Sequence, residues 1–152
     1  MIELSTKKGA ELVRALTMPD IEVGQSISIS VVLDRDVVAA FADLTGDISP
    51  LHVDEAYGQD CEFDGNVAHG MLLAAYFSTL IGVFLPGRTA LLAGLTVDFL
   101  QPVLVGSEVT VSVRVDRVRY GESCIDLVLL CFRGGETVAQ GRAQVKIREK
   151  RA

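Results

Sequence analysis

Asp47 and His52 are the two side chains whose types and spacing best support acid–base chemistry in this chain. Gly46 and Pro50 lie beside and between them, and these residues favour a bent loop over a continuous helix. A bend lets the carboxylate and the imidazole converge on one water, which the pair can deprotonate or protonate as a reaction demands. The spacing therefore predicts an acid–base site.

Two structural alternatives stay open for this pair. Asp47 can instead cap or brace a turn, and His52 can be a hydrogen-bonded histidine near the core. A zinc site made of Asp47, His52 and His69 is a further reading, but catalytic zinc usually has three firm ligands and a second partner for each histidine. The sequence supplies no obvious partners of that kind, so we expect no metal.

A segment without charged residues, Met71 to Leu85, follows and stops at Pro86-Gly87. Such a helix is apolar on all sides and belongs inside a protein, and it is shorter than the roughly 20 apolar residues of a membrane span. Gly70 lets a ligand approach its N–H closely, and the first N–H groups of a helix are unpaired. The helix start is thus a candidate oxyanion or enolate site, or else a glycine placed for packing.

The elements that must position these residues follow from periodicity. Residues 25–33 alternate and predict a first strand, and Asp34 is a plausible N-cap for a helix that ends at Thr45-Gly46. A polar loop is expected over 48–66. Later strands are expected near 109–116, 123–133 and 139–147, with a hairpin turn at Gly134-Gly135. Residues 1–20 show no clear template beyond a short helix from Ala10 to Leu16.

Composition fits one domain over 1–152, with 1–20 as an N-terminal extension. The net charge of −6 and the absence of a basic cluster before the tail Lys146–Arg151 argue against nucleic acid as a partner. Cys61, Cys124 and Cys131 are odd in number and lack metal spacing, which indicates reduced thiols, two of them in a strand and buried. Without an apolar leader at Met1, we expect a cytoplasmic protein that makes no membrane contact.

Together these residues resemble the MaoC-like hydratases, in particular the (R)-specific enoyl-CoA hydratases. The family pattern joins Gly-Asp-x-Asn-Pro-aliphatic-His to a later His-Gly-Met. The matching positions are Phe41, Leu44, Thr45, Gly46, Asp47, Pro50, Leu51, His52, Val67, His69, Gly70 and Met71. Ser49 stands where the family usually has Asn, and Gly58 where Ala or Ser is usual. Serine keeps a hydroxyl but loses the amide, which bears on substrate or water placement more than on reaction type.

The resemblance implies an α+β hot-dog fold, in which a curved antiparallel sheet wraps around a long central helix. Members commonly pair edge to edge, so we expect at least a homodimer. The implied reaction is reversible addition of water to trans-2-enoyl-CoA, giving (R)-3-hydroxyacyl-CoA. It needs no metal or organic cofactor, because the CoA or pantetheine thioester is part of the substrate.

The resemblance also implies roles for particular residues. Asp47 and His52 would hold the water and move protons, and the N–H of Gly70 would meet the thioester oxygen. The expected substrate-side residues are Ser49, His69, Tyr76 and Ser78. Among these, His69 is expected to shape the loop and helix start rather than transfer protons. Ser78 can equally bond to the preceding turn of its helix.

Two alternatives of function stay open. One is a 3-hydroxyacyl-thioester dehydratase of a biosynthetic pathway, acting on CoA or a carrier protein, and the other is a non-catalytic acyl-thioester-binding protein. Hot-dog thioesterases and short-chain acyl-carrier dehydratases resemble each other in placing an acidic residue on the central helix. The segment from Met71 to Leu85 has none, which argues against both.

Overall fold

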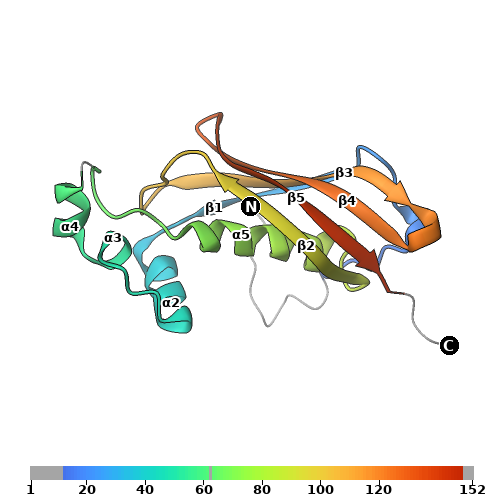
Figure 1. The fold of residues 1–152 in the computed structure, drawn as a ribbon, viewed down its shortest axis with the longest axis horizontal. Helices are drawn as coiled ribbons and strands as arrows, with labels where there is room; N and C mark the ends of the chain where they lie inside the picture. The colour runs from blue at the N-terminus through green and yellow to red at the C-terminus, as the bar shows by residue number, and fades with distance from the viewer. Residues whose placement is uncertain (1–11, 62, 149–152) are drawn as a thin grey trace.

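The computed structural model describes residues 12–61 and 63–148, which form one curved sheet packed on a helix (Figure 1). The strands are β1 (Ser26–Val32), β2 (Ala90–Phe99), β3 (Glu108–Arg119), β4 (Cys124–Arg133) and β5 (Glu136–Ile147). Their order across the sheet is β1-β3-β4-β5-β2, and every neighbouring pair is antiparallel. This is the α+β arrangement expected of a hot-dog fold.

Alternating side chains give the sheet one buried face. On β3 the buried residues are Val109, Val111, Val113 and Val115, and on β4 the alternating buried residues are Ile125, Leu127, Leu129 and Cys131. Because side chains alternate across a strand, the residues between these point to the outer face, which is more polar. The buried face of the sheet therefore packs against the central helix, as the periodicity predicted.

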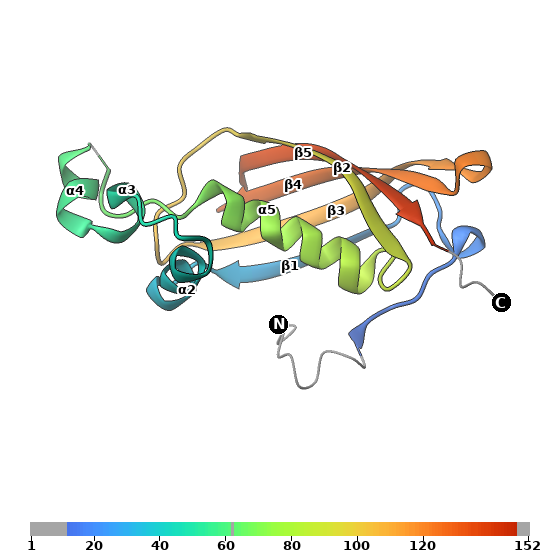
Figure 2. The same cartoon turned by 60° about the horizontal axis from the view of Figure 1, so that its bottom comes forward.

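The central helix is α5 (Gly70–Thr79), continued by the π-helical segment η2 (Leu80–Phe84), and it lies across the concave face of the sheet (Figure 2). Leu73, Phe77 and Leu80 are buried against the sheet. The opposite face of the helix is exposed in the single chain, with Met71 at 62% of its surface accessible. The expectation of a helix buried on all sides is therefore wrong for one chain alone. Within the described residues, no helix is long and apolar enough to cross a membrane.

Three helices lie beside one end of the sheet: α2 (Arg35–Thr45), α3 (Pro50–Val53) and α4 (Glu55–Asp60). The α2 helix is confirmed at both ends, since the Asp34 carboxylate accepts from the N–H of Val37 and Gly46 ends the helix at φ 76°. The expected loop over 48–66 is only partly correct. Pro50 starts α3 because its fixed φ suits a first helical position, and Asp54 caps α4.

The remaining differences lie at the chain's start and at β2. No strand was predicted over Ala90–Phe99, because its Leu-Leu-Ala-Gly-Leu run lacks clean alternation. The Gly134-Gly135 turn is confirmed by positive φ at both residues. Of the helix expected over 10–16, residues 10 and 11 lie outside the described residues. Leu12 is helical, but residues 13–16 are not, because Ala15 forms an antiparallel bridge with Gly87 and Leu16 donates to the carbonyl of Pro86.

Candidate active site

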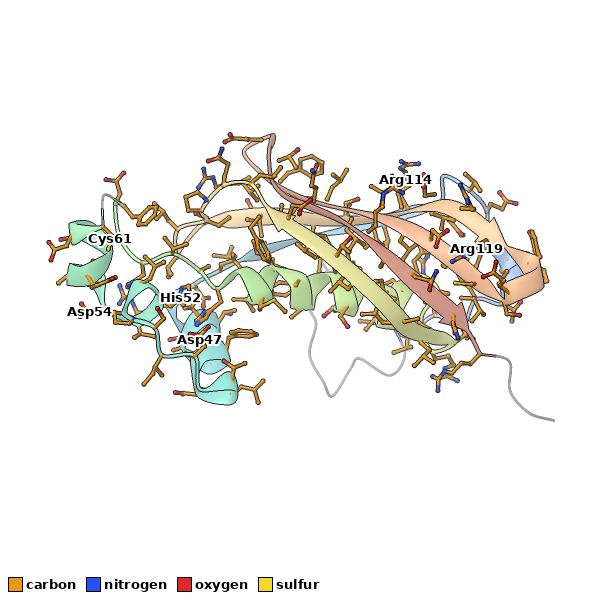
Figure 3. The ribbon with its side chains drawn as sticks, in the orientation of Figure 1. Asp47, His52, Asp54, Cys61, Arg114 and Arg119 are labelled. Carbon is orange, nitrogen blue, oxygen red and sulfur yellow. The ribbon has the colours of Figure 1, made fainter. Side chains whose placement is uncertain are left out.

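Asp47, His52 and His69 converge at the start of α5. One ligand atom from each, a carboxylate oxygen or an imidazole nitrogen, lies within 4.8 Å of the other two. Asp47 follows α2 and is exposed, His52 belongs to α3 and is half-buried, and His69 immediately precedes α5 and is 1% exposed. Figure 3 shows Asp47 and His52 near each other at this end, far from Arg114 and Arg119. The structure thus brings the predicted pair together.

His52 is held in a defined tautomer. Its Nδ1 lies 2.6 Å from the carbonyl oxygen of Val67. A carbonyl can only accept, so Nδ1 donates, and in the neutral ring Nε2 keeps a lone pair. Val67 is itself fixed, since its N–H donates to the carbonyl of Leu51. His52 therefore has one nitrogen committed to the scaffold and one available as a base.

The loop that carries Asp47 is ordered by short-range hydrogen bonds. The Thr45 hydroxyl donates to the carbonyl of Phe41 at 2.7 Å and accepts from the N–H of Asp47 at 3.3 Å. The carboxylate of Asp47 accepts a long bond from the N–H of Ser49, at 3.4 Å. The turn-bracing alternative for Asp47 is thus partly realised. That single weak bond leaves most of the carboxylate's acceptor capacity available to a ligand.

His69 connects the two catalytic candidates. Its Nε2 donates to the backbone carbonyl of Asp47 at 2.9 Å, across a sequence separation of 22 residues. Its ring stacks on His52, with centroids 3.9 Å apart and planes inclined by 31°, and contacts the ring of Phe41 at 5.0 Å. Its Nδ1 is buried and has no hydrogen-bond partner among the described residues. His69 therefore shapes the loop and the helix start.

The same three side chains do not fit a shared metal ion well. Zinc lies about 2.0–2.1 Å from an imidazole nitrogen, in the plane of the ring. Nδ1 of His52 and Nε2 of His69 already bond to backbone carbonyls, so a shared ion would have to bind the remaining nitrogen of each ring, and that of His69 is buried. The arrangement suits proton transfer better than metal coordination.

A cavity of about 280 Å³ opens beside this cluster. One wall is formed by His52, Val67 and Gly70, and the other by the chain from Phe99 to Val103. The N–H of Gly70 is the first of α5, and it makes no backbone hydrogen bond within the described residues. The cavity thus joins a base to an unpaired donor at the positive end of a helix.

The other predicted site residues lie apart from the cavity wall. Ser49 is exposed and precedes α3 without a side-chain capping bond. Tyr76 is half-buried, and burial followed by the Asp34 carboxylate raises the pKa of its phenol. Ser78 is exposed on the open face of α5, eight residues or about 12 Å along the helix from Gly70.

Phe99 is the cavity residue that the sequence reasoning missed. It ends β2, the strand that periodicity did not reveal. The chain also has a looser likeness to the family pattern over Leu95–Pro102, and this is the signal in the sequence that could have pointed to Phe99.

Of the three thiols, none shows the features of a nucleophile. Cys124 and Cys131 are buried on β4, as predicted, and burial raises the pKa of Cys131 to about 11. A thiol that remains protonated at neutral pH is unreactive. Cys61 lies just after α4 and does not line the cavity.

Comparison with known proteins identifies proteins of similar sequence. The chain is 38% identical to the (R)-specific enoyl-CoA hydratase of Aeromonas caviae, over 87% of this chain and 99% of that one. It is 33% identical to a 3-hydroxybutyryl-CoA dehydratase of Methylorubrum extorquens, over 90% of this chain and 87% of that one.

A solved structure shows the same fold. The unliganded R-hydratase PhaJ1 of Pseudomonas aeruginosa superposes with a TM-score of 0.85 at 29% identity, covering 91% of this chain and 89% of that one. The family model of the MaoC like domain matches residues 15–128, which include every residue of the cluster and its cavity. The chain therefore belongs to the MaoC-like domain family.

Proposed function

We propose that the protein is an (R)-specific enoyl-CoA hydratase that adds water reversibly to trans-2-enoyl-CoA, giving (R)-3-hydroxyacyl-CoA. The observation that carries this is the convergence of the Asp47 carboxylate and the His52 imidazole beside a cavity that also contains the start of α5. The similarity to the Aeromonas caviae hydratase over nearly its whole length supports the same reaction.

The geometry suits one activated water. Two hydrogen bonds of about 2.8 Å through a shared water span a little over 4 Å, which fits groups no more than 4.8 Å apart. The water oxygen bonds to C3 of the enoyl group while Asp47 and His52 take its proton. The C2=C3 electron pair moves toward the thioester carbonyl, and a proton returned to C2 completes the addition.

The start of α5 stabilises the charge that develops. As the water attacks, the thioester oxygen gains enolate character, and the N–H of Gly70 is placed to donate to it. The helix dipole adds favourable electrostatics at the same point. In this mechanism the residues that act are Asp47, His52 and Gly70, and neither a metal nor an organic cofactor is required.

The reverse reaction is the second candidate. A site that adds water reversibly also removes it, so the same groups would serve a 3-hydroxyacyl-thioester dehydratase. The similarity to a 3-hydroxybutyryl-CoA dehydratase supports this direction. Physiological concentrations of substrate and product, rather than the site, decide between the two.

The test follows the loss of enoyl-thioester absorbance with crotonyl-CoA and resolves the stereochemistry of the product. We expect turnover to the (R)-3-hydroxyacyl-CoA, and a loss of at least about a hundredfold in Asp47→Asn and in His52→Ala, the scale of lost acid–base catalysis. Asp43→Asn is the matched control, because Asp43 is exposed on α2 and does not belong to the cluster.

Two results would reject the proposal. No turnover in either direction by folded wild-type protein would favour the non-catalytic binder, whose affinity for butyryl-CoA calorimetry would measure. Activity removed by exhaustive treatment with a chelator and restored by zinc would contradict the metal-free mechanism.

We propose further that two copies pair through the open face of α5 and the edge strand β2. This face of α5 and of its continuation η2 exposes residues that carry no charge: Met71, Ala75, Ser78 and, in η2, Gly82. The edge strand β2 exposes Leu91, Leu95 and Phe99, whereas the other edge, β1, exposes three serines and, among its large apolar residues, only Val32 at its end. Contact with a second copy would remove the apolar surface from water and pair the free edge of β2.

A cytoplasmic location also belongs to the proposal. All three cysteines are unpaired, and two are buried in one strand. Such thiols are typical of proteins in reducing compartments.

A further inference from the structure

Phe99 lies over Gly70, at the point where the proposed reaction needs a free N–H. A Cβ atom built on Gly70 would stand 3.1, 3.1 and 3.2 Å from Cε2, Cζ and Cε1 of Phe99. Carbon atoms in favourable contact are about 3.5–4.0 Å apart. A side chain at position 70 would therefore crowd the ring, which would have to shift by a few tenths of an ångström to admit it.

The three distances also give the orientation of the ring. A point nearly equidistant from three consecutive atoms of a six-membered ring lies above its face and not beside its edge. The face of Phe99 thus covers Cα of Gly70, while 46% of the residue remains exposed. Its backbone is fixed at the end of β2, opposite Ala139 of β5.

Phe99 and Gly70 therefore set the separation between the end of β2 and the start of α5. Both line the cavity that contains His52. A thioester carbonyl bound at the N–H of Gly70 in this cavity would therefore lie close to the ring. An aromatic wall there also excludes water, which strengthens a hydrogen bond to the developing enolate.

We propose that Phe99 is a substrate-positioning residue that holds the thioester against the start of α5, and that position 70 is glycine because of this ring. The inference rests on the proposed hydratase function. The contact between Phe99 and Gly70 can be tested apart from the hydrogen bond of the Gly70 N–H. The substitution Gly70→Ala keeps that N–H and fills only the space beneath the ring.

A double-mutant cycle tests the pair. The proteins are wild type, Gly70→Ala, Phe99→Leu and the double variant, compared by kcat and KM for crotonyl-CoA and by thermal midpoint. Gly70→Ala is expected to lower kcat/KM about tenfold in wild type, and by less than about twofold in the Phe99→Leu background. Phe99→Leu alone is expected to lower kcat, since the carbonyl is held less firmly.

Stability gives a readout that is independent of turnover. Alanine is the better helix former, so it should stabilise α5 once the collision is removed. We expect Gly70→Ala to lower the thermal midpoint in wild type, and to leave it unchanged or raise it with leucine at position 99. Gly121→Ala is the control, because a Cβ there meets nothing within 4 Å.

The outcomes separate this inference from the proposed function. An active wild type in which Gly70→Ala costs the same kcat/KM and the same midpoint in both backgrounds overturns the inference alone. A folded wild type without turnover overturns the hydratase function, and the positioning role with it. Coupling in both readouts supports the pair.

Discussion

His52 and His69 are in contact, yet their hydrogen bonds give them different tasks. His52 commits Nδ1 to the carbonyl of Val67, keeps Nε2 uncommitted and lines the cavity, so it can exchange a proton with a ligand. His69 commits Nε2 to the carbonyl of Asp47 and is almost fully buried. Its remaining nitrogen has no partner among the described residues, so we infer that it fixes the loop and moves no proton.

Two substitutions at position 69 separate its hydrogen bond from its ring. Glutamine can place an N–H near the position of Nε2 but loses the stacking, whereas phenylalanine keeps a ring against His52 and loses the donor. We expect His69→Gln to keep kcat within about fivefold of wild type. His69→Phe should lower kcat about 10- to 100-fold, the range of one lost hydrogen bond to a group left unpaired, worth about 1–3 kcal/mol.

The pH profile of kcat distinguishes positioning from proton transfer. A positioning role leaves the shape of the profile unchanged in both variants, because His52 and Asp47 still supply the titrating groups. Loss of one limb in His69→Gln would instead show that His69 transfers a proton. A fully active His69→Phe would show that the bond to the Asp47 carbonyl is dispensable.

Among the helices and strands, the features that could be predicted from the sequence are those set by neighbouring residues. Asp34 and Gly46 mark the ends of α2 through a side-chain cap and a left-handed backbone, and both effects act within a few residues. The motif around Asp47 and His52 predicted that the two side chains converge, but not the tautomer of His52, because its partner Val67 is distant in sequence. Phe99 was missed for the same reason, since β2 is an edge strand defined by its pairing with β5.

The helix α5 carries no charge, yet one of its faces is exposed in a single chain. If a second copy covers this face, a charge placed on it must either be buried without a partner or prevent pairing. We expect Ala75→Glu to convert a dimer, of twice the 16.3 kDa chain mass, into monomers in light scattering after gel filtration. Ser28→Glu is the control, because Ser28 is exposed on β1, away from α5.

Either of two observations would contradict this interface. One is a wild type that runs as a monomer at micromolar concentration, and the other is an Ala75→Glu variant that stays dimeric. In the second case the partner would have to contact another surface.

Charge is distributed unevenly over the whole molecule. Residues 34–64, which form or flank α2, α3 and α4, contain nine acidic residues and a single basic one, a net charge of −8 within a chain of −6. His52 belongs to α3, and Asp47 lies between α2 and α3. An acyl-CoA substrate brings its own negative phosphates to the same end of the protein, so the two repel each other at long range.

Salt should therefore assist substrate capture. Raising the ionic strength from 0.01 M to 0.15 M shortens the Debye length from about 30 Å to about 8 Å, which screens repulsion between exposed charges. We expect kcat/KM for crotonyl-CoA to rise about two- to threefold over this range, mainly through KM. Crotonyl-pantetheine, which lacks the phosphates, serves as the control and should show no change. A fall in kcat/KM with crotonyl-CoA alone would mean that basic side chains at the cavity entrance outweigh the acidic helices, and would locate the phosphate contacts on the strand side of the site.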